Sequence, residues 1–313
     1  MKTPTLATFP PPSLRVRHQS YMDDRPTAPL PLLPSSLSRL LLLLLLLLPF
    51  HLRHRSPVPT SPSQSPTRMW ARPPYAKGGG GVEAGIRALY PVMLEPPELR
   101  WSFIRKIYSI LSAQMLITVA VAAAVVSIHP VSHFFVSSSA GLGLFVFLII
   151  LPFFVICPLY YYYQHYPLNY LLLGIFTVSL GFAVGLTCAF TSGKVILESA
   201  ILTALVVVSL TIYTFWAAAR GYDFTFLGPF LFSSIMILFV FVLIQVLFPV
   251  GRISAMIYGG LAAIVFCGFI VYDTDNLIKR YSYDDYIWAA VALYLDIINL
   301  FLSLLTLFRA ADR

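Results

Sequence analysis

Charged residues are scarce in this chain. They make up 11% of its 313 residues, whereas hydrophobic residues make up 58%. A soluble domain carries about 25% charged residues, because it must cover a surface that faces water. A surface that faces lipid has no such requirement. The scarcity of charge therefore excludes a soluble globular protein and predicts an integral membrane protein.

Cysteine pairs and enzyme motifs are also missing from the sequence. Its three cysteines, Cys157, Cys188 and Cys267, all lie in apolar runs and have no zinc-site spacing. The sequence has no phosphate-binding glycine loop, zinc-protease motif or lipase elbow. It has acids on adjacent predicted helices, as intramembrane aspartyl proteases do, but lacks their glycine-flanked Asp motif. We therefore predict that the protein is not an enzyme and needs no cofactor.

Positive charge is concentrated in the first 68 residues. The chain has a net charge of +8, and residues 1–68 hold eight Lys or Arg against two Asp. This region is rich in Pro, Ser and Arg and poor in aromatic residues, so we predict that it is disordered. A disordered basic tail accounts for most of the charge, so we predict no nucleic-acid partner.

A run of nine leucines, residues 40–48, lies within this basic region. The run is too short to cross a bilayer, which takes roughly 17–25 apolar residues. It is either the hydrophobic part of a signal peptide, although no small-residue cleavage site follows it, or part of an extension upstream of a start at Met69. We favour an extension over residues 1–68, followed by a cytosolic amino-terminal segment (69–100) and the membrane domain (101–313).

Seven apolar segments in the remaining sequence are long enough to cross a bilayer. Each is predicted to be a helix, because backbone groups in lipid must be satisfied within their own segment, and none has the alternation of a barrel strand. The connections at residues 191–194 and 249–253 are short, so consecutive helices are antiparallel neighbours. The predicted fold class is an all-α membrane protein, a seven-transmembrane-helix bundle, with spans at residues 107–128, 141–162, 168–190, 195–218, 227–248, 254–273 and 286–308.

The basic residues in the loops predict the orientation of the chain. A cytosolic amino terminus places six Lys or Arg of the loops in the cytosol and four on the other side. Seven full spans would then place the carboxyl terminus across the membrane from the amino terminus. If the last segment is re-entrant instead, the carboxyl terminus returns to the cytosol.

Three acidic residues, Glu198, Asp273 and Asp296, lie inside predicted spans, where charge is expensive and usually functional. Asp273 and Asp296 are equidistant from residues 284 and 285 in the turn between their helices, which predicts equal depth. Two carboxylates in a low dielectric cannot both ionise cheaply, so the pair is expected to hold one proton and sense pH. The pair is also a candidate transient calcium site, because Ca²⁺ prefers carboxylate oxygens. The alternative is that these side chains only join helices by hydrogen bonds.

Other polar residues are candidates for lining a pathway. Asn299 and Ser303 follow Asp296 at helical spacing and predict one inward polar stripe. Glu198, near the non-cytosolic end of its span, either lines the far end of a pathway or reaches the interface. Asp275, near the cytosolic mouth, either assists the carboxylate pair or is a surface charge.

The sequence FIVYDTDNLIKRYSYDDYIWAAVALYLDIINLFLSLL, residues 269–305, closely resembles the signature of the Bax inhibitor family in its Lifeguard branch. Residues 97–116, PELRWSFIRKIYSILSAQML, resemble the entry into the first span of that family. Residues 211–231, TIYTFWAAARGYDFTFLGPFL, are similar to its middle hairpin. The Met-Trp pair at residues 69 and 70 resembles a plant Lifeguard start, which is why residues 1–68 are interpreted as an extension.

This resemblance implies a seven-helix fold in endomembranes, a role in suppressing stress-induced cell death, and leak of Ca²⁺ from stores. In bacterial relatives, two aspartates on the last two helices form a pH sensor that gates the leak. Those positions match Asp273 and Asp296. The bacterial pair is steadied by an intramembrane Arg, whereas no Arg lies within a predicted span here, so gating either differs or uses an Arg from a loop.

The sequence and the resemblance together predict a pH-sensitive calcium leak channel that suppresses cell death. The expected compartment is the endoplasmic reticulum, with the Golgi and vacuole as alternatives. The expected partners are the lipid bilayer, calcium as the permeant ion, and other membrane proteins of stress or cell-death pathways. The alternative function is a non-conducting membrane scaffold that regulates cell death through protein partners.

Overall fold

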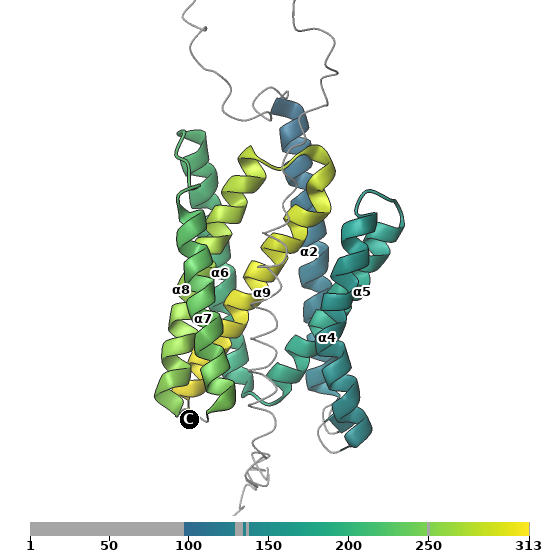
Figure 1. Cartoon of the computed structure of the whole chain (residues 1–313), viewed down its shortest axis with the longest axis vertical. Helices are drawn as coiled ribbons and strands as arrows, with labels where there is room; N and C mark the ends of the chain where they lie inside the picture. Colours follow the sequence, from purple (N-terminus) through teal and green to yellow (C-terminus); the bar gives the residue numbers. More distant parts are fainter. Residues whose placement is uncertain (1–96, 129–133, 136–137, 249–250, 313) are drawn as a thin grey trace, which may run out of the picture. The chain divides into compact units, whose positions relative to one another are not determined.

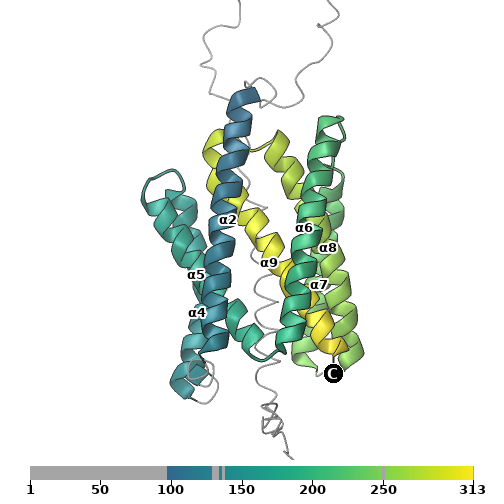
Figure 2. The same ribbon diagram turned by 180° about the vertical axis from the view of Figure 1, so that it is seen from behind.

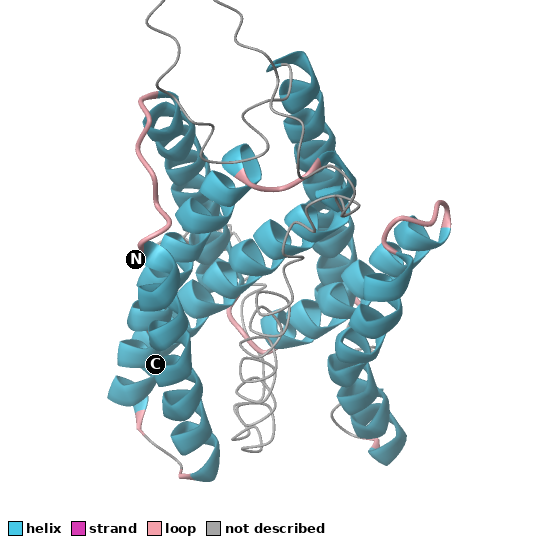
Figure 3. Ribbon diagram, turned by 45° about the horizontal axis from the view of Figure 1, so that its top comes forward, coloured by secondary structure: helices cyan, strands magenta, loops and turns pink. Residues whose placement is uncertain are grey.

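The computed structural model describes residues 97–312, except 129–133, 136–137 and 249–250. The predictions for residues 1–68, and for most of the segment 69–100, lie outside the described residues. The long helices are α2 (Pro97–Ser127), α4 (Ser139–Tyr162), α5 (Leu168–Ala189), α6 (Gly193–Ala219), α7 (Leu227–Leu247), α8 (Arg252–Lys279) and α9 (Tyr286–Ala311). Within the described ranges the elements are helices joined by loops, without strands (Figure 3).

Each of these seven helices is long and apolar enough to cross a membrane. The predicted all-α, seven-span fold is therefore confirmed. Two helices extend well beyond the predicted spans, since α2 begins at Pro97 and α8 continues to Lys279. Hydropathy marks only the part of a helix that lies in hydrocarbon, whereas backbone hydrogen bonds continue through polar residues at the interface.

Helix α9 is long enough to cross a membrane completely. It runs without interruption from Tyr286 to Ala311, about 39 Å at the helical rise, as expected for a full span rather than a re-entrant segment. Its last turn lies beside the first turn of α8, where the Arg252 guanidinium donates a hydrogen bond to the Ala311 carbonyl at 2.7 Å. The described end of the chain therefore lies at the opposite end of α9 from the α8–α9 turn.

Helix α9 lies between two groups of helices. Figures 1 and 2 show it crossing obliquely, with α2, α4 and α5 on one side and α6, α7 and α8 on the other. Its most extensive contact is with α8, and it also packs against α2, α5 and α6. On the outside of these groups, α4 packs on α5 and α7 packs on α8.

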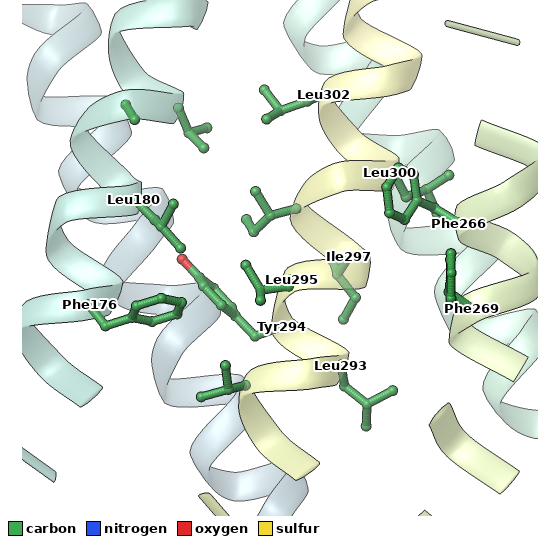
Figure 4. Packing of buried hydrophobic residues seen from close by; sticks show 14 of the residues in the cluster. Phe176, Leu180, Phe266, Phe269, Leu293, Tyr294, Leu295, Ile297, Leu300 and Leu302 are labelled. Atoms are coloured by element: carbon green, nitrogen blue, oxygen red, sulfur yellow. The ribbon is translucent and has the colours of Figure 1, made fainter. Parts of the chain in front are cut away.

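The core of the molecule surrounds α9. In its most apolar stretch 72% of the residues are buried, against 17% for α6, because α9 faces protein on nearly all sides. Figure 4 shows Tyr294 directed towards Phe176 and Leu180 of α5, while Leu300 lies on the side of Phe266 in α8. The Tyr294 and Phe176 rings meet edge to face with centroids 6.2 Å apart.

Small residues bring α2 and α5 close together. Gly181 and Gly185 lie one turn apart on α5, and a Cβ atom at Gly185 would lie 2.9 Å from the Ala122 Cα of α2. A Cβ at Gly181 would lie 3.1 Å from the Val121 Cβ. Without a hydrophobic force between helices in lipid, such close backbone contact is a main source of attraction between them.

Candidate functional site

The two aspartates predicted as a pair lie on α8 and α9, the helices with the most extensive mutual contact. Asp273 is 3% exposed and Asp296 is 0% exposed, so both carboxyl groups lie inside the protein rather than in lipid or water. Burying a charged carboxylate costs much free energy unless it is paired or protonated. Their burial on adjacent helices makes them the centre of the candidate site.

The turn between the two helices is asymmetric. Asp273 lies six residues before α8 ends at Lys279, whereas Asp296 lies ten residues after α9 begins at Tyr286. Counted along the helices at 1.5 Å per residue, Asp296 is therefore about 6 Å further from the end of its helix at the turn than Asp273 is, whereas the sequence predicted equal distances. The prediction took residues 284 and 285 as the tip of the turn, whereas the connection between α8 and α9 runs from Arg280 to Asp285.

Side-chain direction reduces this difference in depth. A Cα–Cβ bond tilts towards the N-terminus of its own helix. In this antiparallel pair the tilt directs Asp273 away from the turn and Asp296 towards it. The two helices also lie close together further from the turn. A Cβ at Gly259 of α8 would lie 2.8 Å from both the Ser303 carbonyl oxygen and the Leu307 nitrogen of α9.

The polar stripe on α9 is completely buried. Asn299 and Ser303 are each 0% exposed. The Asn299 Nδ2 donates to the Leu295 carbonyl at 2.9 Å, and the Ser303 hydroxyl donates to the Asn299 carbonyl at 2.6 Å. Among the residues that the structure describes, the Asn299 Oδ1 has no hydrogen-bond partner. The stripe therefore includes an acceptor that is removed from water and left unsatisfied.

Asp275 is a buried, paired residue rather than a surface charge. Its carboxylate lies 2.6 Å from the Lys279 ammonium, one turn later on α8. It also accepts a hydrogen bond from the Phe224 backbone N–H at 3.3 Å. Lys279 in turn donates to the Tyr222 carbonyl. These contacts fasten the loop between α6 and α7 to the last turn of α8, next to Asp273.

Arg100 holds the same end of α8 from another direction. Its Nε donates to the Ile278 carbonyl at 2.8 Å, one terminal nitrogen donates to Tyr281 at 2.7 Å, and the other donates to Leu277. The Leu277 and Ile278 carbonyls are among those that a helix end leaves without intrahelical partners, and Tyr281 lies just beyond the end of α8. The sequence assigned Arg100 no role beyond orientation, because nothing in the sequence pairs α2 with the end of α8.

Glu198 lies away from this site. It is exposed on α6 and forms an ion pair with Lys194, one turn earlier, at 3.9 Å. Of the two interpretations for Glu198, this position favours the interface over a pathway through the interior.

The residues that could hold a cation are few. Within the described parts of residues 97–312, no group of three or more His, Cys, Asp or Glu side chains could bind a metal ion. Any cation between α8 and α9 would be held by the two carboxylates together with neutral oxygens. Such a weak ligand set suits an ion in transit better than a permanently bound one.

The fold and site define a seven-helix integral membrane protein with two buried carboxyl groups on its last pair of helices. Residues 100–313 match the family described as "Inhibitor of apoptosis-promoting Bax1". The matched range includes all seven spanning helices except the first residues of α2. The chain therefore belongs to this family, the Bax inhibitor family.

Plant Lifeguard proteins are among its similar relatives. The chain is 70% identical to Protein LIFEGUARD 4 of Arabidopsis thaliana over 241 residues, which cover 76% of this chain and 98% of that protein. It is 35% identical to Bax inhibitor 1 of Schizosaccharomyces pombe, covering 69% of this chain and 79% of the relative. It is 33% identical to the Golgi anti-apoptotic protein of Vaccinia virus, covering 69% and 88% respectively.

Proposed function

We propose that this protein suppresses stress-induced cell death from an endomembrane, by letting Ca²⁺ pass slowly out of a store. The names of two similar relatives support the cellular part of the proposal: one is called a Bax inhibitor and the other a Golgi anti-apoptotic protein. The endoplasmic reticulum is the proposed compartment, with the Golgi and vacuole as alternatives. The protein needs neither catalysis nor a cofactor for this role, and calcium is the permeant ion.

The observation that carries the ion-leak proposal is the burial of both Asp273 and Asp296 on the two helices with the most extensive mutual contact. At low pH the pair holds a proton and the two helices stay closely packed. Loss of that proton places two negative charges in a low dielectric, where they repel each other and attract cations. A few kcal/mol of repulsion is enough to shift a helix packing between two states. The leak is therefore expected to increase as pH rises.

The test is Ca²⁺ efflux from liposomes that contain the purified full chain, measured across a range of pH. Wild-type protein should leak more at higher pH, and Asp296→Asn should leak at a rate that does not depend on pH, because the pair can no longer ionise twice. Asp284→Asn removes an exposed carboxylate from the nearby turn and serves as the matched control. An unchanged pH profile in Asp296→Asn would remove the gating mechanism.

A flux result also separates the leak from the scaffold function. If wild-type protein leaks no faster than empty liposomes at any pH, the protein acts as a non-conducting scaffold on other membrane proteins. A double variant, Asp273→Asn with Asp296→Asn, then provides the cellular readout. Under the scaffold function the folded double variant still protects stressed cells, whereas under the leak function protection and flux are altered together.

A further inference from the structure

Asn299 presents an unsatisfied acceptor in the middle of the protein. Its side chain is 0% exposed, and its Oδ1 has no hydrogen-bond partner within the described parts of residues 97–312. Native proteins leave few buried polar atoms unsatisfied, because such an atom loses its water without gaining a partner. The amide is not free to turn away, since its Nδ2 is held by the Leu295 carbonyl at 2.9 Å. The carbonyl oxygen of the amide is therefore held in place with no protein donor.

The position of this oxygen relates it to the carboxylate pair. Asn299 lies three residues after Asp296, so the two side chains share one face of α9. The hydrogen bond to Leu295 directs the amide back along the helix, towards the turn that carries Asp296. One turn further on, the same face lies against α8, where Gly259 meets the Ser303 carbonyl. The Oδ1 therefore lies on the part of α9 that carries Asp296, within about one helical turn of that residue.

We propose that the Asn299 Oδ1 is the third, neutral oxygen ligand of a divalent cation held by Asp273 and Asp296. This inference rests on the proposed function and adds to it a residue that determines ion selectivity. Two carboxylates balance the charge of Ca²⁺, and amide carbonyls are among the oxygens that Ca²⁺ accepts in its flexible shell. Mg²⁺ demands a stricter octahedral shell and keeps its water, so an additional protein oxygen favours Ca²⁺ over Mg²⁺.

A neutral third ligand also suits an ion that must leave again. A third carboxylate would hold the cation with an excess of negative charge and slow its release. The amide adds an oxygen without adding charge, which keeps the affinity of the site low enough for conduction.

The experiment is equilibrium binding of ⁴⁵Ca²⁺ to the purified full chain in detergent at alkaline pH, with Mg²⁺ as competitor. Asn299→Leu replaces the amide by an apolar group of similar size. It is expected to weaken Ca²⁺ binding about tenfold and to reduce the preference for Ca²⁺ over Mg²⁺. Thr306→Val is the matched control on the same helix, because the Thr306 hydroxyl donates to the Leu302 carbonyl one turn earlier and Thr306 lies outside the candidate site. That variant should bind Ca²⁺ within about twofold of wild type.

Each outcome decides the proposal. Unchanged affinity and selectivity in a folded Asn299→Leu protein would mean that the oxygen binds only water, and would overturn it. Absence of Ca²⁺ binding to wild type would overturn it as well. If the Asn299→Leu protein is not monodisperse, Asn299→Ala is used in its place. If neither variant folds, the amide has a purely structural role, and this result would also overturn the proposal. If binding depends on Asn299 but wild-type liposomes do not leak, the site stands and the proposed leak fails.

Discussion

At the scale of single residues, Arg100 links two helices that lie far apart in the sequence. Three of its hydrogen bonds go to main-chain carbonyls at or just beyond the end of α8. A charged donor to a partly buried acceptor contributes more than a neutral one, and its removal leaves the acceptors unsatisfied. Because Asp273 and Asp275 lie in the last two turns of α8, Arg100 also helps to position the candidate site.

Replacing Arg100 by Ala is expected to destabilise the protein by about 2 kcal/mol, because several helix-end carbonyls lose their donor. The midpoint of thermal unfolding in detergent should fall by about 5 °C. Intrinsic tryptophan fluorescence during heating measures this midpoint. Arg105→Ala is the control, since Arg105 lies on the same helix with an exposed side chain, and its midpoint should stay close to that of wild type. Equal effects of the two substitutions would contradict the capping role.

At the scale of elements, the α8–α9 hairpin depends on close contact between two backbones. Gly259 and Gly260 are adjacent on α8 but face different surroundings. A Cβ at Gly259 would lie 2.8 Å from backbone atoms of Ser303 and Leu307, whereas a Cβ at Gly260 would meet no described atom within 4 Å. The two glycines therefore test packing and helix propensity separately.

Gly259→Ala is expected to destabilise the protein by about 1–3 kcal/mol, because the new methyl group forces the backbone of α9 away. Gly260→Ala is expected to stabilise it by about 0.5–1 kcal/mol, since alanine loses less conformational entropy than glycine in a helix. Thermal unfolding monitored by size-exclusion chromatography compares the two proteins. Similar shifts in the same direction would show that the hairpin does not depend on this contact.

At the scale of the whole molecule, buried hydrogen bonds join α9 to the helices on one of its sides. The Thr118 hydroxyl of α2 and the Tyr294 hydroxyl of α9 are 2.7 Å apart and buried. Next to them, the Gln114 Nε2 of α2 donates to the Thr177 hydroxyl of α5 at 3.2 Å. These contacts connect α9 to α2 and α2 to α5 by hydrogen bonds within an otherwise apolar core.

A double-mutant cycle with Thr118→Val and Tyr294→Phe should therefore show a coupling free energy of about 0.5–1 kcal/mol. Each single substitution already breaks the hydrogen bond between the two hydroxyl groups. Adding the second substitution therefore lowers the free energy of unfolding by less than it does in the wild-type protein. The coupling is measured from thermal or denaturant unfolding of all four proteins. A control cycle uses Thr306→Val with Tyr294→Phe, because Thr306 lies about 18 Å along α9 and the two changes should be additive. Coupling of the same size in both cycles would exclude a specific link.

The sequence by itself determined the membrane fold and the identity of the central acids. Lipid leaves backbone groups no external partners, so a long apolar run has to be a helix, and seven such runs predicted seven spans. The expense of burying charge singled out Asp273 and Asp296 before their surroundings were known. Both conclusions follow from the interaction of the chain with its solvent, which composition and length reveal.

Only the tertiary structure decided how the helices face one another. Apolar residues surround most of these helices, so periodicity cannot show which side of a helix meets protein and which meets lipid. For this reason the burial of Asp275, the outward position of Glu198 and the contacts of Arg100 were not determined by the sequence. The offset of Asp296 from Asp273 depends on where α8 ends, which hydropathy does not mark. These features arise from contacts between segments far apart in the chain, and such contacts leave no local pattern.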